Sequence, residues 1–234
     1  MKVLQILPQL NIGGVERGTL DLSKALIHKG HQSFVISGGG ILVDELTQCG
    51  AKHYEIPVHI KSLRTLSLAK RLSETISSID PDIVHVRSRM PAWVNYRAFK
   101  MLQKKPLLVS TFHGLYSFPI YSKVMSFVDH SIAISKTVER YILKNYKLDK
   151  SDITVIPRGC DPLEFNNEVI NPVDKANIIE EFPQIVGKKV LTIPGRITKW
   201  KGVAEFIDLL SLLDDDYHGL IVGPTAKSKK KYLN

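Results

Sequence analysis

The sequence predicts an α/β fold, in which a doubly wound, Rossmann-like parallel sheet is followed by an incomplete second Rossmann-like domain. Short apolar runs alternate with longer segments of helical periodicity along most of the chain. Glycine or proline stands where most of these segments end. Strands of about five residues joined by helices pair in parallel through right-handed crossovers, which is the basis of the prediction.

The first five elements show the pattern clearly. Residues 3–7 form an apolar run ended by a proline, which predicts a buried strand. Residues 19–29 place leucines and an isoleucine on one helical face, and the glycine that follows is a typical helix C-cap. A strand over 33–37 precedes three glycines, a helix over 43–48 precedes a glycine, and a strand over 53–56 is ended by a proline.

The alternation then continues to residue 156. Ser135 is a suitable N-cap for the helix that follows it, and a proline ends the last strand. The remaining predicted elements are a helix over 66–79, a strand over 82–86, a helix over 90–102, strands over 107–112 and 130–134, a helix over 136–145 and a strand over 154–156.

A second cycle begins after a polar stretch. A weak helix over 173–181 precedes a strand over 190–193, a helix over 203–213 and a strand over 219–222. One βαβ unit is too small to bury a core of its own. We therefore expect a truncated chain, in which residues 1–165 form a first domain, 166–187 a linker and 188–234 the start of a second domain.

Charge is distributed unevenly over the 234 residues. Lys and Arg number 32 against 23 Asp and Glu, a formal net charge of +9. Residues 1–157 hold 21 basic and 12 acidic side chains, whereas residues 158–234 hold 11 of each. The excess predicts an anionic partner for the first part: nucleic acid, a phospholipid surface or a phosphorylated substrate. Nucleic acid is disfavoured, because no helix-turn-helix, zinc or RNA-recognition signature is present.

Cysteine usage and hydropathy indicate a cytoplasmic protein. Cys49 and Cys160 are far apart, with no CxxC spacing and no histidine cluster nearby, so they predict neither a disulfide framework nor a zinc site. The N-terminal apolar run is too short for a signal peptide, and no run approaches the roughly 20 residues that span a bilayer. Any membrane contact is therefore expected to be peripheral.

Glycines at the first strand-to-helix turn suggest an anion site. Gly13 and Gly14 lie in the segment 11–18, where backbone amides at a helix N-terminus favour phosphate. A tight turn that needs a positive φ is the alternative. The spacing is not that of a dinucleotide fingerprint, and no acidic residue follows the second strand, so a nicotinamide-dependent dehydrogenase is disfavoured.

Histidine and basic side chains lie at two further predicted strand-to-helix connections. His113 follows a central strand, where parallel sheets bind ligands, although a structural histidine is the alternative; His85 is expected to be a satisfied interior histidine. Arg196 and Lys201 flank the turn before the helix over 203–213, where they could hold a nucleotide diphosphate or form a solvated basic loop.

Together these segments resemble the family 4 nucleotide-sugar-dependent glycosyltransferases of GT-B fold. The matches occur in the family's order and cover most of the chain. They are Gly-Gly-Val-Glu-Arg at 13–17, Pro-Asp-Ile-Val-His at 81–85, Thr-Phe-His-Gly at 111–114, Val-Ile-Pro-Arg-Gly-Cys-Asp at 155–161, and Gly195-Arg196 through Lys201-Gly202.

The resemblance implies a reaction and a set of site residues. A sugar would move from a nucleotide-sugar donor to a glycan or lipid-linked acceptor of lipopolysaccharide or capsule type, with retention at the anomeric carbon and without a metal or other cofactor. The residues implied for the diphosphate are Gly13, Gly14, Arg196 and Lys201, and the implied catalytic residues are His113, Arg196 and Lys201. His113 would contact the transferred sugar, and the acceptor-side candidates are Glu16, Arg17, Arg87 and Arg89.

Two alternatives remain open from the residues themselves. Basic amphipathic stretches at 61–77 and 90–105 suit an anionic membrane, but their apolar residues could equally face the core. Members of the family carry a Glu-x7-Glu element in the second domain, and we expect this sequence to end before that element. A non-catalytic acceptor-binding or membrane-binding module, with its donor half lost or supplied by another chain, is therefore the alternative to an active enzyme.

Overall fold

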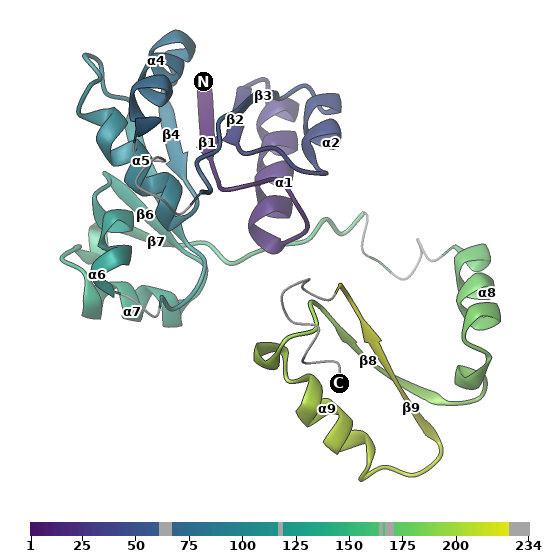
Figure 1. Ribbon diagram of the computed structural model, residues 1–234. Coiled ribbons are helices and arrows are strands. Elements are labelled where there is room, and N and C mark those ends of the chain that lie inside the picture. The colour runs from purple at the N-terminus through teal and green to yellow at the C-terminus, as the bar shows by residue number, and fades with distance from the viewer. Residues whose placement is uncertain (61–66, 117–118, 164–165, 167–170, 225–234) are drawn as a thin grey trace. The chain divides into compact units, whose positions relative to one another are not determined.

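A computed structural model describes residues 1–60, 67–116, 119–163, 166 and 171–224 (Figure 1). It divides into two compact units, Met1–Gly159 and Cys160–Asn234. The domain boundary expected at residue 165 and the predicted helix start at residue 66 lie outside the described residues.

The first unit is built on a seven-stranded sheet in which every neighbouring pair is parallel. The strand order is β3-β2-β1-β4-β5-β6-β7, so the chain adds strands on one side of β1 and then on the other. This confirms the doubly wound α/β fold. The strands are β1 (Lys2–Ile6), β2 (Gln32–Ser37), β3 (Lys52–Glu55), β4 (Ile83–Val86), β5 (Leu107–Phe112), β6 (His130–Ala133) and β7 (Ile153–Val155).

Helices cover both faces of this sheet. α1 and α2 lie on one face, and α4 and α5 on the other (Figure 1). The apolar side chains of β1 and β2 are buried on both faces, as an all-parallel sheet requires. The helices of this unit are α1 (Gly14–His28), α2 (Val43–Gln48), α4 (Ala69–Ile79), α5 (Arg89–Phe99), α6 (Pro119–Ser122) and α7 (Lys136–Asn145), with a 3-10 turn η1 (Lys123–Ser126) before β6.

The start of α1 differs from the sequence-based prediction. The helix begins at Gly14, five residues before the predicted start at residue 19. Its buried residues are Thr19, Leu20 and Ser23, two of which are polar. In the first turn, Val15 alone is apolar, so there is no helical repeat to reveal the start of the helix. The glycine motif expected in a turn lies mostly inside the helix.

The second unit contains one βαβ cycle, as predicted. β8 (Lys189–Pro194) and β9 (Tyr217–Val222) pair in parallel, and α9 (Val203–Leu210) lies between them in sequence. The stretch expected as a linker contains α8 (Pro172–Glu181) and a 3-10 turn at Pro183–Ile185. Among the described residues of this unit, Val203 is the one buried apolar side chain, which fits the expectation that a single βαβ cycle makes little core.

Candidate functional site

The carboxyl ends of four strands of the first unit bring polar residues together. Gly14 follows β1 at the start of α1, Arg87 follows β4, His113 follows β5 and Arg158 comes shortly after β7. β1 and β4 are neighbours in the sheet, and the chain adds further strands in one direction from β1 and in the opposite direction from β4. Doubly wound sheets bind ligands at the point where this direction reverses, and the cluster lies there.

Glycine at positions 13 and 14 makes space for neighbouring side chains and is not required by an unusual backbone conformation. Gly13 is the N-cap of α1 with φ 169°, an extended conformation open to any residue. The alternative of a tight turn with positive φ therefore does not apply. A Cβ on Gly14 would clash with the guanidinium of Arg158, and one on Gly13 would lie 3.0 Å from the carboxyl carbon of Glu16. Glycine at these positions permits the side chains of Arg158 and Glu16 to approach the N-terminus of α1 closely.

A hydrogen bond fixes the protonation of His113. Arg158 Nη2 donates to His113 Nδ1 over 2.8 Å. Burial, with the charges of Arg87 and Arg158, lowers the pKa of His113 to about 3, so the ring is neutral at neutral pH. Arginine cannot accept a hydrogen bond, so the ring proton must be on Nε2. Nε2 is buried and has no hydrogen-bond partner among the described residues, which leaves a donor for a ligand.

Arg87 is a buried cation in the short connection between β4 and α5. Its exposed fraction is 7%, and its Nη1 donates to Gln5 Oε1 over 2.7 Å. Gln5 is oriented by donating its own amide to Thr19 O and Ser23 Oγ. Burial, with the positive charge of Arg158, lowers the pKa of Arg87 to about 10, so the side chain remains charged at neutral pH. The family resemblance implied an acceptor-side role for Arg87, and this burial was not predicted.

The other acceptor-side candidates occupy separate surroundings. Arg89 lies over the rings of Tyr116 and Tyr121, at 4.9 and 5.4 Å from their centroids. Arg17 forms ion pairs with Asp21 at 3.1 Å and Glu45 at 3.6 Å. Glu16 lies against Gly13 in the first turn of α1. Of these candidates, Glu16 and Arg87 border the cluster around His113, because the carboxylate of Glu16 acts on the pKa of Arg87.

His85 behaves as predicted, as an interior histidine with a satisfied ring. It is buried within β4, and its Nε2 lies 2.7 Å from Thr111 Oγ1. Burial lowers its pKa well below the usual value, so it is neutral at neutral pH.

In the second unit, the two predicted cations lie beside one backbone turn. Arg196 follows Gly195 at the carboxyl end of β8, and Lys201 ends a 3-10 turn just before α9. A Cβ on Gly195 would lie 3.4 Å from Lys201 Cε, so the aliphatic part of the Lys201 side chain packs against Gly195, the residue before Arg196. Neither side chain is buried. Whether the glycine turn of α1 and these cations hold the same diphosphate stays a prediction.

The first unit also has a hollow away from the cluster around His113. This hollow of about 570 Å³ is lined by residues such as Lys105, Leu107 and Asp129. It lies at the amino end of β5, the opposite end from His113. Within the described ranges no group of three or more His, Cys, Asp or Glu side chains could hold a metal ion. No described helix is long and apolar enough to cross a membrane.

The helices predicted as candidate membrane-binding surfaces turn their apolar residues inward. Leu72 is fully buried, and Leu68 packs against the main core. Trp93, Tyr96 and Phe99 also pack against that core. The structure thus supports the core alternative for these residues, although Met101 in the second stretch is 57% exposed. Residues 61–66 lie outside the described part. More exposed apolar side chains occur elsewhere: Leu115 is 60% and Ile120 90% exposed.

Several known proteins with similar sequences or folds are glycosyltransferases. The model of the family described as Glycosyltransferase Family 4 matches residues 12–163, more than half of the chain. A crystal structure of a glycosyltransferase from Rickettsia africae is 34% identical with a TM-score of 0.83. That match covers 100% of this chain and 62% of the Rickettsia protein.

Two further relatives extend the comparison. An uncharacterized glycosyltransferase of Methanocaldococcus jannaschii is 30% identical over 175 residues, which cover 65% of this chain and 43% of that protein. HepE of Anabaena, solved in complex with UDP and glucose, has a TM-score of 0.82 at 17% identity, with 100% of this chain and 64% of HepE covered. The chain thus spans less than two thirds of the length of each of these three relatives.

Proposed function

The chain belongs to glycosyltransferase family 4, and we propose that it moves a sugar from a nucleotide-sugar donor to a glycan or lipid-linked acceptor. In this proposal the first unit takes the acceptor and the second unit begins the donor site. The sugar is transferred with retention at the anomeric carbon and without a metal. The acceptor belongs to the lipopolysaccharide or capsule class.

The observation that carries the proposal is the free Nε2–H of His113. This donor is buried at the carboxyl end of a central parallel strand, and the Arg158 hydrogen bond keeps it on that nitrogen. A neutral imidazole N–H suits the hydroxyl oxygen of a sugar, because it donates without adding a charge. His113 therefore contacts the transferred sugar in our proposal and holds it for reaction.

Charge develops on the departing diphosphate during such a transfer. Arg196 supplies two-pronged donors and Lys201 a point charge, and both lie beside the Gly195 turn. The amides at the N-terminus of α1, which begins after Gly13, add a positive dipole end. Preorganised groups of this kind stabilise the leaving group, and loss of one costs roughly 10²–10³ in rate.

UDP is the first donor nucleotide to test. HepE of Anabaena has been solved with UDP and glucose, and its fold is similar to that of this chain. A uridine diphosphate sugar is therefore the donor that we propose first, with a guanosine diphosphate sugar as the comparison.

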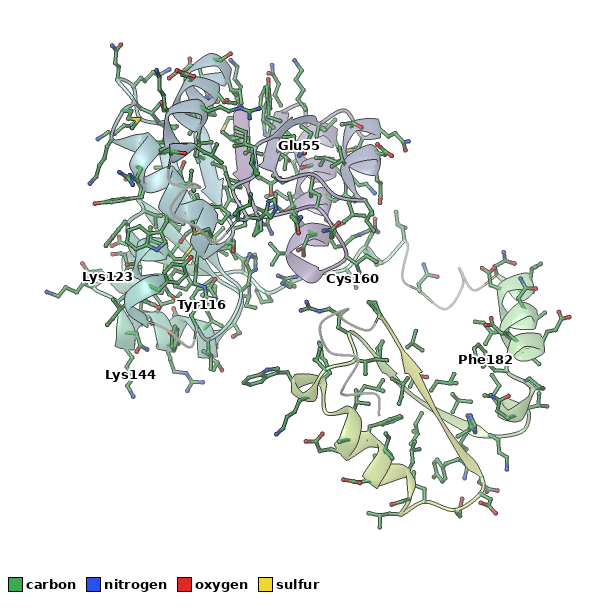
Figure 2. All side chains as sticks on the ribbon, viewed as in Figure 1. Glu55, Tyr116, Lys123, Lys144, Cys160 and Phe182 are labelled. Atoms are coloured by element: carbon green, nitrogen blue, oxygen red, sulfur yellow. The ribbon has the colours of Figure 1, made fainter. Side chains whose placement is uncertain are left out.

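The acceptor is proposed to lie at the cytoplasmic face of a membrane, with the protein bound peripherally. Leu115 precedes α6 and Ile120 lies within it, and both are exposed apolar residues close in sequence to Lys123. Figure 2 shows the side chain of Lys123 pointing away from the body of the first unit. Exposed apolar and basic side chains in one segment suit an anionic lipid surface.

A non-catalytic module is the second candidate. It is favoured by one observation: the second unit has a single βαβ cycle with one buried apolar side chain among its described residues. In that case the first unit would bind an acceptor or a membrane, and the donor half would come from another chain.

Calorimetric titration of the full chain with UDP and GDP separates the two candidates. We expect one nucleotide to bind, and Arg196→Ala or Lys201→Ala to weaken it about 10-fold or more. Lys175→Ala, in exposed α8, is the matched control and should leave the Kd unchanged. If neither nucleotide binds, the donor site is not functional in this chain and the module is favoured.

A further inference from the structure

The first unit holds a buried arginine with an unused donor. Arg87 uses Nη1 on Gln5, but its buried Nε has no hydrogen-bond partner among the described residues. Gln5 itself donates to Thr19 and Ser23, so the arginine is held in place from that side. The Nε–H is therefore positioned but unsatisfied, which is costly for a buried charged group.

A second arginine lies along the same helix face. Gly14 and Gly18 are one turn apart in α1, so they lie on one side of the helix. A Cβ on Gly18 would be 3.2 Å from Arg87 Nη2, and a Cβ on Gly14 would be 3.2 Å from Arg158 Cζ. Each glycine leaves room for one guanidinium, and the two cations are brought to adjacent positions at the positive end of the helix.

No carboxylate neutralises this pair directly. In the described part of the chain, neither Arg87 nor Arg158 has an ion pair with an acidic side chain within 4.0 Å. Glu16 and Asp21 act on Arg87 from farther away, and Asp21 is bound to Arg17. Two adjacent guanidinium groups, one of them buried, with no paired anion, indicate that an anionic ligand completes the site.

We propose that Arg87 and Arg158 form a subsite for a phosphate ester carried by the acceptor. Two guanidinium groups suit phosphate because each offers a planar, two-pronged set of donors. The assignment to the acceptor rests on the proposed function, in which Arg196 and Lys201 of the other unit hold the donor diphosphate. The charge of the first unit agrees, since residues 1–159 hold 22 basic and 12 acidic side chains.

The test uses the full chain with glucose 6-phosphate as the probe, titrated calorimetrically in the presence and absence of saturating UDP. We expect the probe to bind in both conditions. Arg158→Met should weaken it about 10-fold or more, because Arg158 supplies charge-assisted hydrogen bonds. Arg140→Met, in α7, is the matched control and should bind as the unaltered chain does.

Arg87→Met tests the buried partner, with circular dichroism to check that the variant folds. If it does not fold, the exposed Arg158 carries the test alone. Competition between UDP and glucose 6-phosphate would overturn the assignment and give the pair to the donor diphosphate. So would a Kd for glucose 6-phosphate that Arg158→Met leaves unchanged, or no binding of that probe.

The two proposals fail differently. In the variant carrying both Arg196→Ala and Lys201→Ala, we expect glucose 6-phosphate to bind normally while UDP affinity falls. Binding of UDP without binding of glucose 6-phosphate would overturn the phosphate subsite and leave the glycosyltransferase proposal standing. Arg158-dependent binding of glucose 6-phosphate without any nucleotide binding would support the subsite and contradict the donor site.

Discussion

Arg158 Nη2 donates a hydrogen bond to His113 Nδ1 over 2.8 Å, and this contact decides which nitrogen of the imidazole carries the proton. The ring is neutral, so its proton is confined to Nε2, which is buried and unpartnered within the described residues. A side chain near the end of the first unit thus sets the donor properties of a residue that follows β5. Arg158 acts as a positioning residue for His113.

Without Arg158, the proton of the neutral His113 ring should no longer be confined to Nε2. In Arg158→Met the Nδ1 acceptor loses its donor, so both neutral tautomers become accessible. We expect the two ring ¹⁵N shifts of His113, well separated in the unaltered protein, to move toward each other. Arg140→Met provides the control for loss of an arginine away from the site. Ring shifts that stay the same in Arg158→Met would show that something else fixes the proton.

The depressed pKa of His113 should make stability depend on pH. The unfolded chain binds a proton near pH 6.5, whereas the folded site, where the pKa is about 3, does not. The stabilisation that comes from the neutral His113 is therefore fully present above pH 6.5, and it is lost as the pH falls from 6.5 towards 3. At pH 5 the loss from His113 amounts to about 2 kcal/mol in the free energy of unfolding.

His113→Gln removes this contribution and keeps a polar side chain at the site. Urea unfolding at pH 7 and pH 5 should show a smaller loss of stability on acidification in the variant than in the unaltered chain. His85, whose pKa is lowered first by burial and then by Arg87 and His113, is present in both proteins, so only the part of its contribution that depends on His113 differs between them. Equal pH dependence in the two proteins would refute the shift at His113.

The doubly wound fold could be predicted because its signals are local. Each buried strand is an apolar run, and each helix that packs with leucine and isoleucine repeats them at helical spacing. The first turn of α1 lacks that signal, since Val15 is the one apolar residue between Gly14 and Arg17. Apolar residues in α4 and α5 were compatible with a membrane or a core, and tertiary packing decides for the core.

The candidate site could be predicted only in part. Strand ends and glycines point to His113 and Gly14, because sheet topology fixes where such residues gather. The pairing of Arg158 with His113 joins residues 45 positions apart, and no local pattern encodes it. Likewise, Arg87 and Arg89 are neighbours in sequence, but one is buried beside Gln5 and the other lies over two tyrosine rings.

Two alanine substitutions in α1 should separate binding from stability. In Gly14→Ala the new Cβ meets the end of the exposed Arg158 side chain, which can move away. Alanine favours a helix over glycine by up to about 1 kcal/mol, so the free energy of unfolding should stay the same or rise. The Arg158–His113 hydrogen bond should be lost, and the His113 ring shifts should report it.

Gly18→Ala is the matched comparison at the next turn. Its Cβ would lie 3.2 Å from Nη2 of the buried Arg87, which Gln5 holds in place. We expect this variant to gain less stability than Gly14→Ala, or to lose stability, while the His113 ring shifts remain unchanged. Thermal unfolding and the ring shifts together check the pair. The same response from both variants would contradict the separate roles of the two glycines.

Membrane contact should depend on the exposed segment around α6 rather than on α4 or α5. Ile120 is 90% exposed, and Lys123 follows it closely. Ile120→Ser and Lys123→Gln should each reduce co-sedimentation with vesicles that contain phosphatidylglycerol, since a basic side chain near an anionic surface contributes about 1 kcal/mol. Lys144→Gln is the matched control, because Lys144 also points away from the first unit (Figure 2) but lies on α7. Equal sedimentation with phosphatidylcholine vesicles, or no effect of Ile120→Ser, would show that this segment does not bind lipid.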